Sequence, residues 1–166
     1  MAQNIEIKIN IDGFTDILNI LEQEKVELKQ VLNQRDIYYN HSKGLLKLRI
    51  FDDKGELIFY QRDELTTDRI SNYHILNVEP KQAEKFFERI FETETEVVKT
   101  RKLYIYKNTR IHLDEVKNLG NFLELETVVK NNIQEGKKEF DEVVELLKLN
   151  VSKQIKSSYR TLLMNK

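Results

Sequence analysis

Apolar and polar residues alternate from the start of the chain. Isoleucine occupies every second position from 5 to 11, with polar residues between. A period of two predicts a β-strand with one apolar and one polar face. The apolar residues of segment 14–21 then recur at helical spacing, with Asp12 placed to cap the helix. The chain is therefore expected to begin with a strand and a helix.

Alternating segments recur along the rest of the chain. We expect further strands at Val31–Tyr39, Leu45–Phe51, Glu56–Arg62, Arg69–Val78, Glu96–Tyr106, Thr109–Val116 and Asn121–Val129. The turn sequences DDKG and KNLGN favour antiparallel hairpins between neighbouring strands. Helical spacing predicts one helix that begins at Pro80, one around residues 140–147 and one in SSYRTLLM.

About eight short strands with inserted helices predict an α+β fold. The apolar stripes of the helices need an apolar surface to cover, and the strands offer one face each. An eight-stranded antiparallel β-barrel, closed or nearly closed, meets this requirement. With 166 residues, the chain is expected to form one domain of two similar halves, about 1–79 and 80–166. The pattern leaves the pairing order of the strands open.

The composition of the chain excludes several classes of binding partner and reactive site. The 27 basic and 28 acidic residues give a net charge of −1, which argues against a long nucleic-acid footprint. The chain has no cysteine, which excludes disulfides, thiol nucleophiles and thiolate metal sites and leaves oxygen and imidazole ligands. Apolar runs are short and the N-terminus lacks a signal-peptide pattern, so we expect a cytoplasmic protein without a membrane partner.

Ionisable and other polar residues gather on the polar faces of the predicted strands. They are Asn4, Glu6 and Lys8; Lys47 and Arg49; Arg62; Lys99 and Arg101; Arg110, His112 and Asp114; and Glu124 and Glu126. Any one of these faces alone is typical of the solvent-exposed side of a sheet. If helices cover the apolar faces of a barrel, however, the polar faces point inward. Crowded cations there are costly unless a polyanion, such as a triphosphate with metal, neutralises them.

Several segments resemble, in chain order, motifs of the CYTH family of triphosphate tunnel metalloenzymes. NIEIK is similar to the family's Glu-x-Glu-x-Lys, and LLKLRIF to its Leu-x-x-Arg-x-Arg strand. RIHLDEVKNLGNFLELE resembles its aspartate strand, Leu-Gly turn and Phe-x-Glu-x-Glu strand. The segments QRDIYYN, IFYQR, VVKTRKLY and SSYRTLL are also similar to family motifs. The resemblance implies an eight-stranded tunnel that binds a triphosphate with Mg²⁺ or Mn²⁺.

The resemblance also implies roles for individual residues. The implied metal ligands are Glu6, Asp114, Glu124 and Glu126, with Asn4 standing where the motif has its first glutamate. The implied phosphate-binding residues are Lys8, Lys47, Arg49, Arg62, Lys99 and Arg101. The implied catalytic set is Glu6, Lys8, Arg49, Asp114 and Glu126, and Arg35 and Tyr38 are candidate substrate contacts. His112 is a further candidate contact, because it shares a strand face with Arg110 and Asp114.

Two enzymatic activities fit these implied roles. One is that of a class IV adenylate cyclase, a lyase that converts ATP to cyclic AMP and pyrophosphate. The other is a hydrolase acting on ATP, thiamine triphosphate or tripolyphosphate. The alternative is a non-catalytic module that binds a nucleotide or polyphosphate, because the carbonyl oxygen of Asn4 is a poorer ligand for a hard cation than a carboxylate. A homodimer is expected by analogy alone.

Overall fold

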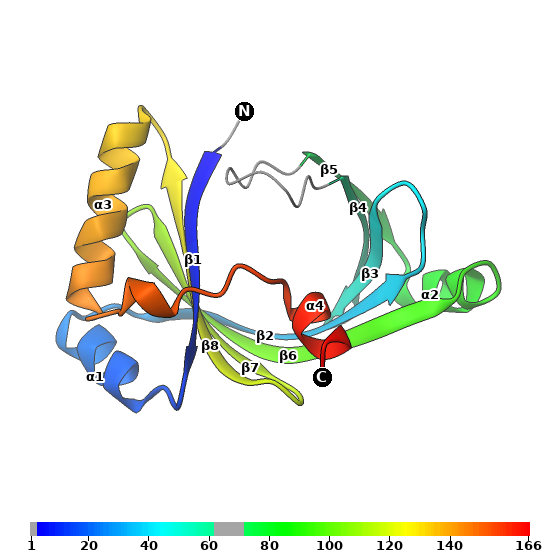
Figure 1. Ribbon diagram of the computed structural model, residues 1–166, viewed down its shortest axis with the longest axis horizontal. Helices are drawn as coiled ribbons and strands as arrows, with labels where there is room; N and C mark the ends of the chain where they lie inside the picture. The colour runs from blue at the N-terminus through cyan, green and yellow to red at the C-terminus, as the bar shows by residue number, and fades with distance from the viewer. Residues whose placement is uncertain (1–2, 62–71) are drawn as a thin grey trace. The chain divides into compact units, whose positions relative to one another are not determined.

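The computed structural model describes residues 3–61 and 72–166 (Figure 1). The strands in this part of the chain are β1 (Gln3–Ile11), β2 (Leu28–Tyr39), β3 (Leu45–Phe51), β4 (Lys54–Gln61), β5 (Asn72–Val78), β6 (Thr93–Tyr106), β7 (Thr109–Val116) and β8 (Gly120–Val129). The helices in the same residues are α1 (Thr15–Gln23), α2 (Pro80–Glu88), α3 (Ile133–Leu146) and α4 (Tyr159–Met164), and η1 (Val151–Lys153) is a short 3-10 helix. None of these helices has the length and apolar character needed to span a membrane.

The predicted strands and helices are present, with some different boundaries. β2 begins at Leu28 and α3 at Ile133, several residues before the predicted starts. The predicted strand residues 62 and 69–71 lie outside the described part of the chain. The prediction that Asp12 caps α1 was wrong, because the N-cap is Phe14 and makes no side-chain hydrogen bond.

The strands are hydrogen-bonded in the order β1-β8-β7-β6-β2-β3-β4-β5. Neighbouring strands such as β1 and β8, or β3 and β4, run antiparallel. Strands β1 and β5 end this order, and within the described residues no ladder joins them. Eight antiparallel strands with flanking helices confirm the predicted α+β architecture.

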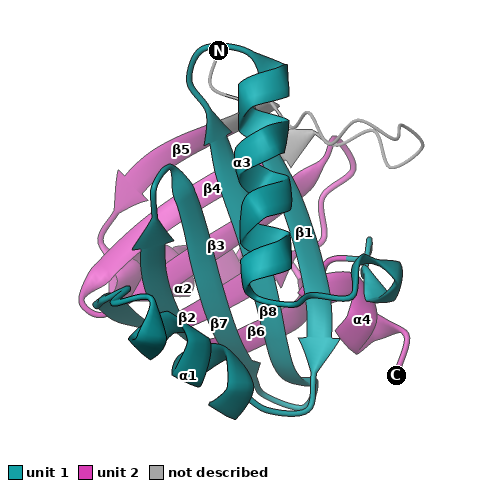
Figure 2. Ribbon diagram, turned by 90° about the vertical axis from the view of Figure 1, so that its left-hand side faces the viewer, with its two compact units in different colours: residues 1–32, 100–157 teal, residues 33–99, 158–166 magenta. Residues whose placement is uncertain are grey.

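The chain forms two compact units, each built from two separate stretches of sequence (Figure 2). Unit 1 comprises residues 1–32 and 100–157, and unit 2 comprises residues 33–99 and 158–166. Strands β2 and β6 each contribute to both units. The division of the sequence into halves near residue 79 stays a prediction.

In unit 1, helices α1 and α3 cover one face of strands β1, β7 and β8 (Figure 2). The core beneath them consists of Ile7, Ile9, Ile17, Leu21, Tyr104, Ile111, Leu113, Leu123, Leu125, Val143 and Leu147. Because successive side chains of a strand point to opposite faces, the intervening polar residues lie on the face away from these helices. This arrangement confirms that the helices cover the apolar strand faces.

In unit 2, helix α2 covers the apolar face of β2 and β3. The buried residues there are Ile37, Tyr39, Leu46, Leu48 and Ala83. Glu79 caps the helix by accepting hydrogen bonds from Lys81 N and Gln82 N, and Pro80 occupies the first turn as predicted. The alternate positions of β2 and β3 again carry polar residues on the opposite face.

Candidate functional site

The strand register of unit 1 arranges its polar face in rows across β1, β8 and β7. Glu6 of β1 lies opposite Glu126 of β8, which lies opposite Arg110 of β7. The next row holds Lys8, Glu124 and His112, and the row after it holds Asn10, Phe122 and Asp114. The register therefore places Lys8 in the same three rows as the predicted metal ligands Glu6, Asp114, Glu124 and Glu126.

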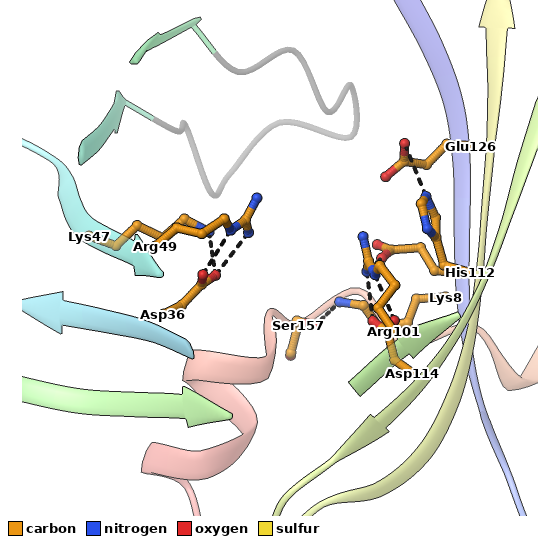
Figure 3. A network of polar contacts seen from close by, with 10 residues as sticks. Lys8, Asp36, Lys47, Arg49, Arg101, His112, Asp114, Glu126 and Ser157 are labelled. Carbon is orange, nitrogen blue, oxygen red and sulfur yellow. Dashed lines mark hydrogen bonds and ion pairs between the residues drawn. The ribbon is translucent and has the colours of Figure 1, made fainter. Parts of the chain in front are cut away.

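Arg101 of β6 binds two of these acids (Figure 3). Its Nε and Nη2 atoms donate to the two carboxylate oxygens of Asp114, each at 2.6 Å. Nη2 also donates to Glu124 Oε2 at 2.7 Å. Asp114 is 0% exposed, so this charge-assisted network lies inside the protein. The two hydrogen bonds from Arg101 to Asp114 fix the plane of the Arg101 guanidinium.

Two basic side chains lie next to Glu126. His112 Nε2 is 3.5 Å from Glu126 Oε2, and Arg110 Nε is 3.0 Å from the same oxygen. Burial by itself would raise the pKa of the Glu126 carboxyl, but the His112 contact and the charges of His112, Arg110 and Arg101 outweigh burial and lower this pKa to about 2. Glu126 is therefore ionised at neutral pH, as an oxygen ligand for a metal must be.

Replacing Arg110 with methionine is expected to raise the pKa of Glu126, because one of the charges that favour its ionised form is removed. The low pKa means that stability supplied by this carboxylate is complete above pH 4.5 and lost as pH falls towards about 2. Carbon NMR titration of the glutamate carboxyl measures the change. Lys107→Met, which breaks the exposed pair with Glu142, is the control. An unchanged Glu126 pKa in Arg110→Met would contradict this account.

The C-terminal segment of unit 1 contacts Lys8. The Lys8 Nζ atom donates to the main-chain oxygen of Ser157 at 3.0 Å, and the N–H of Ile155 donates to the main-chain oxygen of Lys8 at 2.8 Å. Only 6% of Lys8 is exposed. The ammonium group is thus placed by hydrogen bonding rather than left free in solvent.

Asp36 organises the polar face of unit 2 (Figure 3). Lys47 Nζ donates to Asp36 Oδ2 at 2.7 Å, and Arg49 donates from Nε and Nη2 to the two Asp36 oxygens at 2.8 and 2.9 Å. Burial opposes ionisation, but Lys47 and Arg49 hold the pKa of Asp36 well below its usual range. Sequence reasoning missed Asp36 as a site residue, although it lies directly opposite Arg49 in the register of β2 and β3.

Tyr38 lies on the same polar face, opposite Lys47 in register, and the Lys47 Nζ atom is 5.4 Å from the centre of its ring. Arg35 lies on the other face of β2, where it pairs with Glu84 of α2 at 2.7 Å and Glu96 of β6 at 3.0 Å. These two ion pairs link β2 to α2 and β6, and the predicted substrate contact of Arg35 stays a prediction. Arg62 lies outside the described residues.

The oxygen donors of unit 1 suit a hard cation. Among residues 3–61 and 72–166, no group of three histidine or acidic side chains is arranged to hold a metal ion. Magnesium, however, is commonly bound by one or two carboxylates plus phosphate oxygens of the substrate. Glu6 and Glu126 occupy directly opposite positions on β1 and β8, so both carboxylates could bind the same cation. This pair fits a metal that is shared with phosphate.

Comparison with known proteins identifies the family of this chain. The model of the CYTH domain matches residues 2–159. A Methanocaldococcus jannaschii protein, whose name gives adenylate cyclase as a suggested activity, is 30% identical over 169 residues, covering 93% of this chain and 95% of its own.

Solved structures share the fold of this chain. A Pyrococcus horikoshii OT3 protein has a TM-score of 0.81 and 25% identity, covering 96% of this chain and 99% of its own. A Hippeastrum protein, suggested to be an adenylyl cyclase and described as having a dominant triphosphatase activity, has a TM-score of 0.74 and 12% identity, covering 98% of this chain and 96% of its own. Because the family model spans nearly the whole sequence, the chain belongs to the CYTH family.

Proposed function

We propose that this chain binds an organic triphosphate together with Mg²⁺ or Mn²⁺ and converts it, by adenylate cyclase chemistry or by hydrolysis. The observation that carries the proposal is the polar face of β1, β7 and β8, where strand register sets Lys8 beside the paired acids Glu6 and Glu126. Membership of the CYTH family and the activities named for two relatives support the same reading.

The basic side chains would bind the phosphates. In unit 1, Lys8 and Arg101 would donate charge-assisted hydrogen bonds to non-bridging oxygens, and Asp114 would keep the Arg101 guanidinium in a fixed orientation. In unit 2, the proposed phosphate donors are Lys47, Arg49 and Lys99. Asp36 gives Lys47 and Arg49 a shared anchor, which reduces the side-chain entropy lost when a phosphate binds.

Glu6 and Glu126 would hold the metal, with Glu124 in the neighbouring row. A divalent metal at this pair would neutralise charge that develops on the phosphate oxygens. Asp114 is engaged on both oxygens by Arg101, so we assign it to positioning that arginine. Asn4 stands two residues from Glu6 on β1, where its side-chain oxygen would be a weaker ligand.

A product assay separates the two reactions. In a cyclase the ribose 3′-hydroxyl attacks the α-phosphorus and pyrophosphate leaves, whereas in a hydrolase water attacks the terminal phosphorus. ATP, thiamine triphosphate and tripolyphosphate, each with Mg²⁺ or Mn²⁺, form the substrate panel. Cyclic AMP and pyrophosphate from ATP would support the cyclase, and orthophosphate without a cyclic product would support the hydrolase. An absence of any product would overturn the proposed conversion.

A binding module without turnover is the second candidate. Two observations favour the binding module, because each reduces the negative charge available to bind a metal. Asn4 stands in place of a carboxylate, and Arg101 forms ion pairs with Asp114 and Glu124. Tight triphosphate binding without turnover on the whole panel would establish this reading.

Replacing Asn4 with glutamate is expected to strengthen Mn²⁺ binding several-fold, since it adds a carboxylate on the strand that carries Glu6. Titration calorimetry with Mn²⁺ and tripolyphosphate measures the affinity. Asn4→Gln keeps a neutral amide and serves as the matched control. Equal affinity in the glutamate and glutamine variants would contradict a metal site at this end of β1.

A further inference from the structure

Helix α4 carries a tyrosine that contacts a proposed phosphate-binding lysine. The Nζ atom of Lys99 lies 5.1 Å from the centre of the Tyr159 ring. Both side chains belong to unit 2, and their residues are only 7% and 8% exposed. The pair is therefore a cation–π contact that is largely shielded from water, where such contacts are strongest.

The helix that carries Tyr159 is itself fixed in place. Arg160 forms a bidentate ion pair with Glu94 of β6, and its guanidinium carbon lies 6.0 Å from the centre of the Tyr38 ring. Ser158 caps the helix by accepting a hydrogen bond from Thr161 N at 3.1 Å. These contacts hold Tyr159 at a defined position relative to β2 and β6 of its unit.

We propose that Tyr159 is a positioning residue that orients Lys99 for a triphosphate, with the pair of Arg160 and Glu94 holding the helix that presents it. This inference rests on the proposed function. It extends the proposed phosphate-binding residues of unit 2 to helix α4.

An aromatic ring suits this task for an electrostatic reason. A lysine has a flexible four-carbon stem and loses rotamer entropy when its ammonium group is fixed. The face of a tyrosine ring attracts the ammonium group but carries no net charge. The contact with Tyr159 therefore orients Lys99 without adding a carboxylate that would compete with phosphate. If Lys99 is already oriented before the triphosphate binds, less side-chain entropy is lost on binding and the affinity is higher.

A double-mutant cycle tests the proposal through tripolyphosphate affinity, measured by calorimetry in metal-free buffer. Tyr159→Leu removes the ring and keeps an apolar side chain, and it is expected to weaken binding by about threefold to tenfold. Tyr159→Phe keeps the ring and is expected to bind within about twofold of wild type. In a Lys99→Met background, Tyr159→Leu is expected to have no further effect.

The outcomes separate this inference from the proposed function. Equal weakening by Tyr159→Leu with Lys99 present or absent would assign Tyr159 a merely structural role and overturn the inference. Weakening by Tyr159→Phe would overturn it as well, even if Tyr159→Leu fails to fold, because the ring is retained. Wild-type protein that binds no tripolyphosphate or nucleoside triphosphate, with or without metal, would overturn the proposed function and this inference together. Circular dichroism establishes that each variant tested is folded.

Discussion

Glu126→Ala is expected to lower triphosphate turnover at least about 100-fold, because a bound metal stabilises charge by several kcal/mol and each 1.36 kcal/mol is a factor of ten in rate. Glu126 lies opposite Glu6 and is ionised at neutral pH, which makes it the acid best placed to bind the metal. Steady-state rates with Mg²⁺ and Mn²⁺ measure the loss. Calorimetric titration with Mn²⁺ should show weaker metal binding in the same variant.

Glu115→Ala is the matched control for this substitution. Glu115 lies on β7 beside Asp114 but is exposed, so its removal is expected to leave turnover unchanged. Circular dichroism of both variants checks that the fold survives. Normal turnover in folded Glu126→Ala would show that this carboxylate does not hold the catalytic metal.

Asp36→Ala is expected to destabilise the fold by about 3–5 kcal/mol, since removing one partner of a buried ion pair leaves uncompensated charge inside the protein. The substitution leaves Lys47 and Arg49 without their shared carboxylate. Urea unfolding followed by circular dichroism measures the free energy of unfolding. Glu27→Ala, which breaks an exposed pair with Lys29, is the control and is expected to change stability by less than about 1 kcal/mol.

The effect of Asp36→Ala should depend on pH. Because the pKa of Asp36 in the folded protein lies below its ordinary value, its contribution is complete above about pH 4, the pKa of an unfolded aspartate, and is lost as the pH falls further. The stability gap between wild type and Asp36→Ala is therefore expected to narrow in acid. A gap that stays constant from neutral pH to pH values well below 4 would contradict the ion-pair account.

Strand positions and the face of each strand could be predicted from the alternation of residues. The isoleucines of β1 pack under α1 and α3, while Glu6 and Lys8 lie on the other face, as their spacing indicates. Segments without clear alternation were harder to delimit. The start of β2 is exposed on both faces, and Ile133 at the start of α3 is 60% exposed, so neither leaves a one-sided apolar pattern.

The ion pairs of the site could not be predicted because they depend on register between distant segments. Asp36 and Arg35 are neighbours in sequence, but strand geometry sends one to the polar face and the other towards α2. Arg160 and Glu94 are 66 residues apart, and nothing in either local pattern indicates that they meet. Only the matching order of family motifs predicted that the acids of β1 and β8 would act together.

Phosphorus NMR of tripolyphosphate and ATP, incubated with the wild-type protein and Mn²⁺ or Mg²⁺, tests the central claim most directly. The proposed function predicts that a triphosphate spectrum decays while pyrophosphate with cyclic AMP, or orthophosphate, appears. Unchanged spectra of both compounds, from folded protein at concentrations that bind them, would contradict the claim that this polar face converts a triphosphate.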